Sequence, residues 1–313
     1  MWYMKKYIVP LMCLILIVCV AIKYDSLVTF ATDFFTNKQD TIILSGNEYT
    51  KKDDYLYVQR SKKFSPLSKQ DILNIYFSII NNHWETFTFY CPSEYEKCVD
   101  DITSLSNDAV TLSNINNFVH PYNSFESLKT SIDTQGEIIV KVTYLYTKDQ
   151  ITYINNEVDK IIEETYDKND DMSDNIKKIH DYIINNTTYD VDYKKNKERL
   201  TYTAYGTLVH HLATCNGYTD LMAIILNKLG VKNYKIAYNP SGDTNEDGHV
   251  WNAVYIDNRW LHLDLTWDDP VGDGHDYLYH KYFLVTTDEM KEADSGNVQV
   301  DEHNYDKHIY QEF

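Results

Sequence analysis

The most informative part of this sequence is residues 249–265, which read HVWNAVYIDNRWLHLDL. Apolar side chains alternate on either side of the Asp-Asn dipeptide at 257–258, a pair typical of tight turns, so the segment predicts an antiparallel β-hairpin. A two-residue loop pairs Trp251 with Asp264. His249 and Asp264 then lie on one face of the hairpin as diagonal neighbours, about 7–8 Å apart at Cα, where a carboxylate can hold an imidazole.

A second informative segment precedes the hairpin and reads TCNGYTDLMAIILNKLG at 214–230. Its apolar residues recur at helical spacing, which predicts a buried helix that ends at Gly230. Cys215 therefore lies at the start of this helix, where free N–H groups and the helix dipole stabilise a thiolate and can receive an oxyanion. The alternative interpretation is that Cys215 is an inert buried residue of the first turn, and the helix alone fits both.

Three residues of these segments form a possible catalytic set. A thiol nucleophile needs a base within hydrogen-bond reach, and the base needs a third group that fixes its tautomer. A cysteine at a helix start, with a histidine and an aspartate on one face of a hairpin, is much harder to obtain by chance than any one of them. We therefore predict a triad of Cys215 as nucleophile, His249 as base and Asp264 as orienting acid.

The order of these motifs resembles the transglutaminase-like superfamily. The matching stretches are YTAYGTLV (202–209), CNGY (215–218), HVWNAV (249–254) and HLDLTWDDP (262–270). The resemblance covers most of residues 173–290. It implies an α+β, papain-like core in which the nucleophile helix packs on an antiparallel sheet, and it implies the same triad.

Further residues near the triad have weaker predicted roles. The backbone N–H of Cys215 is the first oxyanion donor, and Tyr205 is a candidate side-chain donor. Trp251 and Trp267 are predicted to wall the site and exclude water. A tyrosine or tryptophan packed in the core would give the same sequence, so each of these has a structural alternative.

The N-terminal residues form a candidate export segment. The Lys pair at 5–6 is followed by an apolar run over 7–22, interrupted only by Pro10. A positive segment before an apolar one is the pattern of a signal peptide, and a run of this length approaches that of a membrane anchor. We predict that residues 1–31 are a cleaved signal peptide or a retained anchor, and that the rest faces outward from the cytoplasmic membrane.

The remaining chain is predicted to contain a linker and two domains. Residues 32–54 are polar and read as a linker, residues 55–168 as a smaller α/β domain, and residues 169–313 as the catalytic domain. Periodicity predicts helices at 68–81, 150–166 and 173–186, and strands at 86–90 and 137–146. The 55–168 region contains no catalytic constellation and lies outside the family resemblance.

The positions of the cysteines predict one disulfide if the chain is exported to an oxidising compartment. The chain has five cysteines, of which Cys13 and Cys19 lie in the leader. Cys91 and Cys98 are close in sequence, and we predict a local disulfide between them. This leaves Cys215 as the only free thiol of the exported part.

Composition and spacing argue against several other classes of protein. The net charge is −18, with 47 acidic and 29 basic residues and no basic stripe, which excludes nucleic acid as a partner. Residues 243–248 match the first half of a calcium loop, but its twelfth position is Val254, so the bidentate Glu is missing. The acidic residues over 268–276 read as a surface loop, and His210, His211 and His262 lack zinc-ligand spacing. We therefore predict no metal and no cofactor.

The predicted activity is acyl transfer or hydrolysis through a thioester, outside the cytoplasmic membrane. Water as acceptor makes the protein a peptidase or amidase, and a Lys-type amine makes it a transglutaminase; the triad is the same for both. Expected substrates are peptides, proteins or cell-wall peptides, with membrane contact through the N-terminal segment if it is not cleaved. The alternative is a non-catalytic surface module that uses this fold for binding or assembly.

Overall fold

The computed structural model describes residues 64–133, 136–195, 200–238, 248–271, 277–295 and 303–310. The predicted leader and linker, residues 243–247 of the half calcium loop, and residues 272–276 of the acidic loop lie outside these ranges. Residues 42–313 belong to one compact unit. Among the described residues, no helix has both the length and the apolar character needed to cross a membrane.

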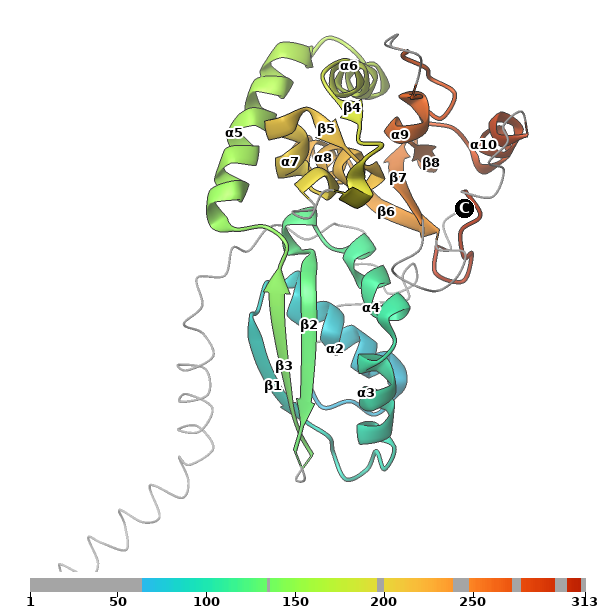
Figure 1. Cartoon of the computed structure of the whole chain (residues 1–313). Coiled ribbons are helices and arrows are strands. Elements are labelled where there is room, and N and C mark those ends of the chain that lie inside the picture. The colour runs from blue at the N-terminus through green and yellow to red at the C-terminus, as the bar shows by residue number, and fades with distance from the viewer. Residues whose placement is uncertain are drawn as a thin grey trace, which may run out of the picture. The chain divides into compact units, whose positions relative to one another are not determined.

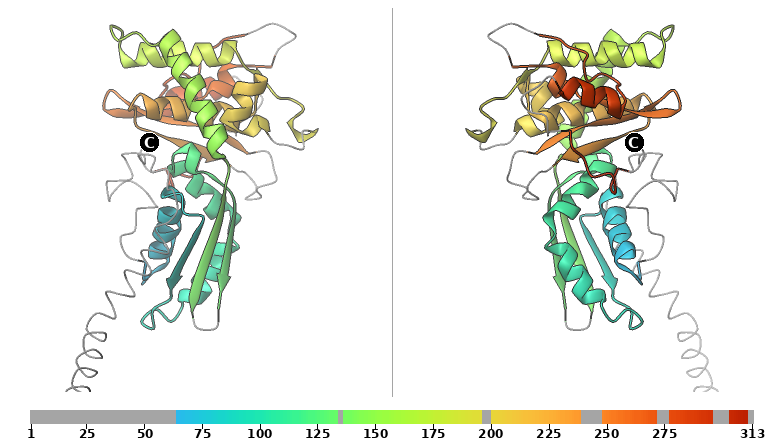
Figure 2. Two further views of the ribbon diagram at one scale, coloured as in Figure 1. Left: turned by 90° about the vertical axis from the view of Figure 1, so that its left-hand side faces the viewer. Right: turned by 90° about the vertical axis from the view of Figure 1, so that its right-hand side faces the viewer.

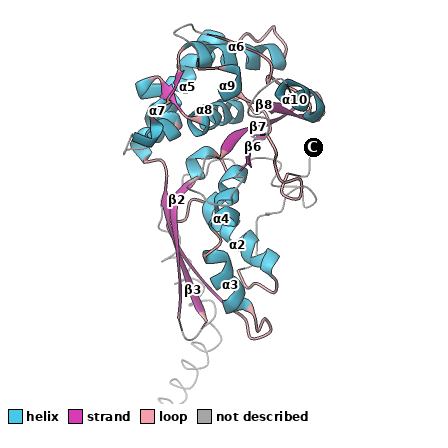
Figure 3. Cartoon of the chain, turned by 45° about the vertical axis from the view of Figure 1, so that its right-hand side comes forward, coloured by secondary structure: helices cyan, strands magenta, loops and turns pink. Residues whose placement is uncertain are grey.

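The first sheet is antiparallel with strand order β1-β3-β2. Alternation along β3 buries Ile138, Val140 and Val142 on one face. Helices α2, α3 and α4 cover this face (Figure 1, Figure 3). The bounds are β1 (Thr86–Tyr90), β2 (Phe125–Ile132), β3 (Glu137–Tyr144), α2 (Lys69–Asn81), α3 (Cys98–Ser106) and α4 (Ala109–Ile115).

Two long helices follow the first sheet. The predicted helices over 150–166 and 173–186 are observed as α5 (Lys148–Thr165) and α6 (Met172–Asn185). A capping box between Thr147 and Gln150 starts α5, because it satisfies backbone N–H groups that the first turn leaves free. The apolar side of α5 packs into the same core as α6 and the nucleophile helix, although the sequence assigns these residues to the first domain.

The second sheet is antiparallel with order β6-β7-β8 and contains the predicted hairpin. Ile256 of β7 (His249–Ile256) pairs with Arg259 of β8 (Arg259–Leu263), so the two-residue loop is confirmed. Asp257 and Asn258 both have positive φ, 52° and 62°, as a type I′ turn requires. The predicted register therefore holds through the hairpin, and β6 (Asn233–Tyr238) pairs with the other edge of β7.

Each face of the second sheet belongs to a different hydrophobic core. Tyr234 and Trp251 belong to the core that also contains residues of α2 and β3, whereas Val254 and Leu263 belong to the core that contains residues of α5, α6 and α8 (Cys215–Lys228). Figures 1 and 2 show the helices α5–α8 on one side of this sheet and the first sheet with its helices on the other. The second sheet thus joins the two halves of the described chain.

The nucleophile helix α8 (Cys215–Lys228) packs on β7, and Thr219 donates its hydroxyl to the carbonyl of Val250 at 3.0 Å. Helix α7 (Ala204–His210) lies beside α8. The remaining elements are short: β4 (Thr188–Tyr189), β5 (Leu212–Ala213), α9 (Leu265–Asp268), α10 (Thr287–Asp294), and the 3-10 turns η2 (Asn116–Phe118), η3 (Pro121–Asn123), η4 (Tyr193–Lys195) and η5 (Leu200–Tyr202).

A disulfide joins Cys91, just after β1, to Cys98, the first residue of α3, with their Cα atoms 5.7 Å apart. We expect the double variant Cys91→Ser/Cys98→Ser to lose about 2–3 kcal/mol of unfolding free energy, because closing a short loop restricts the unfolded chain. Urea unfolding of both proteins measures this difference. Wild-type protein treated with dithiothreitol is the control, and finding both thiols alkylatable in unreduced protein would contradict the bridge.

Candidate active site

Cys215 is the first residue of α8 and the free cysteine of the described chain, and it is 8% exposed. The preceding residue, Thr214, is extended, and its hydroxyl donates to the Thr201 carbonyl at 3.3 Å rather than capping the helix. No side chain at the N-cap therefore satisfies the first-turn N–H groups in this part of the structure. The Asn216 amide donates to Cys215 Sγ at 3.9 Å. The helix start thus presents donors around the thiol.

Gly217 fixes how closely the first turn of α8 approaches its neighbours. A Cβ atom at this position would lie 2.5 Å from Thr207 Oγ1 and 2.6 Å from the Thr201 carbonyl oxygen. The second contact is with backbone and cannot be relieved by a rotamer change. Only glycine lets α8 begin here, and this close approach holds Cys215 in place.

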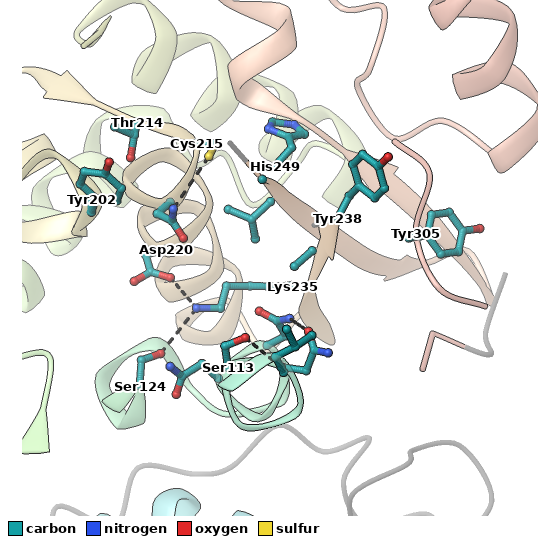
Figure 4. Close-up of a pocket in the computed structure, with 18 of the residues that line it drawn as sticks. Ser113, Ser124, Tyr202, Thr214, Cys215, Asp220, Lys235, Tyr238, His249 and Tyr305 are labelled. Atoms are coloured by element: carbon teal, nitrogen blue, oxygen red, sulfur yellow. Dashed lines mark hydrogen bonds and ion pairs between the residues drawn. The ribbon is translucent and has the colours of Figure 1, made fainter. Parts of the chain in front are cut away.

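His249 stands at the start of β7, and its Nε2 lies 2.5 Å from Asp264 Oδ2. Both side chains are buried. Burial alone lowers the pKa of His249, but the Asp264 charge and hydrogen bonds to Asp264 and Cys215 outweigh it and hold the pKa well above its ordinary value. The imidazole therefore binds the carboxylate through Nε2 and has Cys215 as a further polar partner. Figure 4 shows Cys215 and His249 beside each other at the cavity.

Asp264 accepts four hydrogen bonds. Its Oδ1 accepts from the backbone N–H groups of Thr266 and Trp267 at 2.9 and 3.2 Å, which makes it the N-cap of α9. Its Oδ2 accepts from His249 and, at 3.0 Å, from His303 Nε2. Burial alone raises the pKa of Asp264, but the two imidazoles lower it far below its usual range. Asp264 is therefore an ionised, fully bonded anion.

Residues 159–265 match the family model described as the transglutaminase-like superfamily, and they carry Cys215, His249 and Asp264. This segment is a transglutaminase-like domain. Its α+β fold, with the nucleophile helix on an antiparallel sheet, is confirmed. The separation into two domains near residue 168 stays a prediction.

Two curated relatives of the transglutaminase-like domain are the kyphoscoliosis peptidases of Mus musculus and Homo sapiens, 27% and 26% identical over 120 residues. These residues make up 34% of this chain and only 18% of either relative. Similar solved structures include a TGase crystal structure (TM-score 0.34, 20% identity, 45% of this chain and 43% of that one). Another is the periplasmic domain of TgpA from Pseudomonas aeruginosa (TM-score 0.27, 11% identity, 46% and 64%).

His303 is a residue of the transglutaminase-like site that the sequence did not indicate. It lies 39 positions after Asp264, and besides that carboxylate it contacts Asp294 Oδ1 through Nδ1 at 2.8 Å. Its side chain is 2% exposed. No periodicity or motif marks this position, since the contact spans several elements.

The predicted tryptophans surround the imidazole of the transglutaminase-like site. The Trp251 ring stacks on His249 with centroids 5.6 Å apart, and its Nε1 donates to His262 Nδ1 at 3.1 Å. Trp267 meets the same imidazole edge-on at 6.4 Å. Burial lowers the pKa of His262 to about 3, so this neighbouring ring is neutral. Both rings contact His249, and their role in excluding water from the site stays a prediction.

Tyr205 lies in a different environment from the one expected of an oxyanion donor. Its ring packs edge-on against Tyr153 of α5 at 5.4 Å, and it is absent from the described residues that line the Cys215 cavity. The helix α7 turns this side chain toward α5 rather than toward the thiol. Tyr202, three residues earlier, lines the cavity beside Thr214 (Figure 4).

Cys215 and His249 line a cavity of about 860 Å³ in the transglutaminase-like domain. Its wall also includes Ser113 and Ser124 (Figure 4), which with Asn117 come from the region before that domain. The sequence assigned no site role to residues 55–168. The structure brings this region to the cavity because η2 packs on β6.

A buried ion pair lines the same cavity. Lys235 Nζ lies 2.7 Å from Asp220 Oδ1, and the side chains are 9% and 4% exposed. Tyr146 donates its hydroxyl to Asp220 Oδ2 at 2.7 Å, and accepts from the Ala204 N–H at 2.9 Å. This network links β6, α8 and the chain just before α5.

We expect Lys235→Met to lower the unfolding free energy by about 3–5 kcal/mol, because it leaves the Asp220 charge buried without its partner. The control is Lys228→Met, which breaks the pair between Lys228 and Asp159 at 2.5 Å on the surface, where about 1 kcal/mol or less is expected. Urea unfolding measures both. Equal losses in the two variants would show that the buried pair has no special role.

Among the residues that the structure describes, two groups of side chains could gather a metal ion: His180, Asp181 and His280, and His249, Asp264 and His303. In the first group, Lys177 Nζ pairs with Asp181 Oδ2 at 2.9 Å and places a competing positive charge there. In the second, protein donors already occupy the carboxylate. Neither set fits a cation well, and the absence of a metal requirement stays a prediction.

Proposed function

We propose that this protein is a thiol-dependent enzyme that acts on amide bonds of peptides or proteins through a thioester intermediate. Members of the transglutaminase-like superfamily are typically cysteine peptidases or acyltransferases. The single observation that carries the proposal is the bond between His249 Nε2 and Asp264 Oδ2 at 2.5 Å, with Cys215 on the other side of the imidazole. This arrangement supplies a nucleophile, a base and an orienting anion.

In the first step, the Cys215 sulfur, deprotonated by His249, attacks the carbonyl carbon and forms a C–S bond. The carbonyl oxygen takes up the negative charge and accepts hydrogen bonds from N–H groups at the start of α8. His249 then gives its proton to the amide nitrogen, the C–N bond breaks, and the amine leaves. The acyl group remains on sulfur as a thioester.

In the second step, an acceptor attacks the thioester and His249 takes a proton from it. The C–S bond breaks and the thiol is restored. Water yields a carboxylic acid, whereas a primary amine yields a new amide. We favour hydrolysis, because the curated relatives are named peptidases.

We also propose that the protein acts outside the cytoplasmic membrane, on peptide, protein or cell-wall peptide substrates. Support comes from the charge and apolar pattern of residues 1–31 and from the Cys91–Cys98 bridge, since disulfides persist in oxidising compartments. A reporter fused after Phe313 tests the location. Reporter activity inside the cytoplasm would contradict it.

The activity is tested by incubating the protein with casein and a biotin-labelled primary amine, followed by mass spectrometry. Cleaved peptides indicate hydrolysis, and labelled glutamines indicate transamidation. The rate of Cys215 alkylation by iodoacetamide at neutral pH is measured in parallel. A thiol no more reactive than free cysteine, with neither product formed, would contradict the enzyme and favour a non-catalytic binding module.

A further inference from the structure

We propose that His303 is a positioning residue of the Cys215 site: as a cation held by Asp294, it fixes the carboxylate of Asp264 that orients His249. This inference rests on the proposed function, because it concerns the same reacting groups. The network runs from Asp294 through His303 and Asp264 to His249, and all four residues are buried.

The charge of His303 follows from its two partners. Its Nδ1 lies 2.8 Å from Asp294 Oδ1, and its Nε2 lies 3.0 Å from Asp264 Oδ2. An ionised carboxylate only accepts hydrogen bonds, and a neutral imidazole donates from one nitrogen only. While both carboxylates are ionised, an imidazole that bridges them donates from both nitrogens and so carries a proton on each.

The position of the Asp264 carboxylate depends on donors at both oxygens. Two backbone N–H groups hold Oδ1, while His249 and His303 share Oδ2. Without His303, one of the four bonds is lost from a residue that is 1% exposed, where no bulk water replaces it. The plane of the carboxylate is then less firmly fixed, and so is the imidazole that it orients.

His303 is enclosed by groups from several elements. The titratable ones are Asp264, Asp294, His249 and His262. Aromatic rings complete the enclosure, with centroids 5.0 Å away for Trp251, 5.5 Å for Trp267 and 5.1 Å for Tyr282. Charges in such a dry setting interact strongly.

The cation on His303 also opposes a second cation on His249, whose ring centroid is 5.4 Å away. Burial lowers the pKa of His303, the bonds to Asp264 and Asp294 raise it overall, and the His249 charge lowers it. The repulsion between the two rings is mutual. While His303 carries its charge, the same repulsion acts on His249 across 5.4 Å, so we infer that His303 limits how far Asp264 can raise the pKa of the base and helps His249 release its proton.

The test is the pH dependence of Cys215 alkylation by iodoacetate, an anion that the thiolate attacks faster while His249 is protonated. The rate therefore falls on the alkaline side of the profile, as His249 loses its proton. The alkaline limb of this profile is the pH range over which the alkylation rate falls. In His303→Gln, we expect the midpoint of this limb to shift to higher pH by about one unit, because a charge that repels the His249 cation is gone. We expect kcat/KM on casein peptides to fall about 10–100-fold, the range found when partners that orient a metal-bound imidazole are lost.

His262→Gln is the matched control. His262 is also a fully buried imidazole, with partners in Trp251 and Thr287, but it is neutral at the pH of the test. Its loss removes packing without removing a charge, so the alkaline limb should stay at the wild-type pH. A shift of equal size in both variants would overturn the role of the His303 charge.

Asp294→Asn supplies a second variant in case His303→Gln does not fold by circular dichroism. It keeps an acceptor for His303 Nδ1 but removes the charge that favours the cation, so a smaller shift in the same direction is expected. An unmoved limb in a folded variant would overturn the inference. If wild-type Cys215 reacts with iodoacetamide no faster than free cysteine, the proposed function fails instead, whatever His303 does.

Discussion

Cys215→Ser is expected to lower kcat/KM by about 10⁴-fold or more, with the unfolding free energy within about 1 kcal/mol of wild type. The serine is nearly isosteric with the cysteine, so packing at the start of α8 changes little. Its hydroxyl is a far weaker nucleophile beside an imidazole placed for a thiol. Steady-state hydrolysis of casein peptides and urea unfolding measure the two quantities.

The double variant Cys91→Ser/Cys98→Ser is the matched control for this experiment. It also replaces sulfur by oxygen, but at the bridge between β1 and α3 rather than at the cavity. It should lose stability and keep activity, whereas Cys215→Ser should do the reverse. Activity retained by Cys215→Ser would rule out a thioester mechanism.

Asp264→Asn is expected to affect both activity and stability. An asparagine that keeps its oxygen toward the N–H groups of Thr266 and Trp267 turns its NH₂ group toward His249 and His303. Donors then face donors, and the His303 cation loses a buried partner. We expect kcat/KM to fall about 10²–10³-fold and the unfolding free energy to fall about 3–5 kcal/mol.

The stability loss of Asp264→Asn should depend on pH in a defined way. A carboxylate with a lowered pKa stabilises the fold above its unfolded pKa, about 3.9, and this contribution fades as the pH falls through the folded value. His249 and His303 have raised pKa values, so they stabilise below about pH 6.5 and lose this effect as the pH rises.

The difference between wild type and Asp264→Asn should therefore be largest between about pH 4 and pH 6.5. Urea unfolding at a series of pH values measures it. A difference that stays constant from pH 3 to pH 9 would mean that the carboxylate acts only as the N-cap of α9 and not through the imidazoles.

The hairpin that carries His249 and Asp264 could be predicted from the sequence because its determinants are local. Residues 257 and 258 tolerate positive φ, and alternation on both sides allows one register. The helix over 68–81 could be predicted from the sequence for the same reason, since Ser68 caps it and its apolar residues recur at helical spacing.

Other features had weak local signals. Strand β2, Phe125–Ile132, buries little of either face, so its residues alternate without a clear apolar side. Helices α3 and α4 are short, and their capping and apolar patterns cover few residues. His303 depends on a contact 39 positions away, and the direction of Tyr205 depends on how α7 packs. These are set by tertiary packing and not by neighbouring residues.

The hydrophobic core shared by both sheets has a practical consequence for anyone who prepares this protein. The ring of Phe118 stacks on Tyr234 at 5.6 Å, and Tyr310 reaches back to the Asn117 amide at 2.8 Å. A recombinant fragment that starts at residue 169 would lose Phe118 and its neighbours, and would expose the apolar face of β6 and β7 to solvent. Such a fragment should express poorly and aggregate, so fragments intended for assays or crystals should begin at or before residue 64.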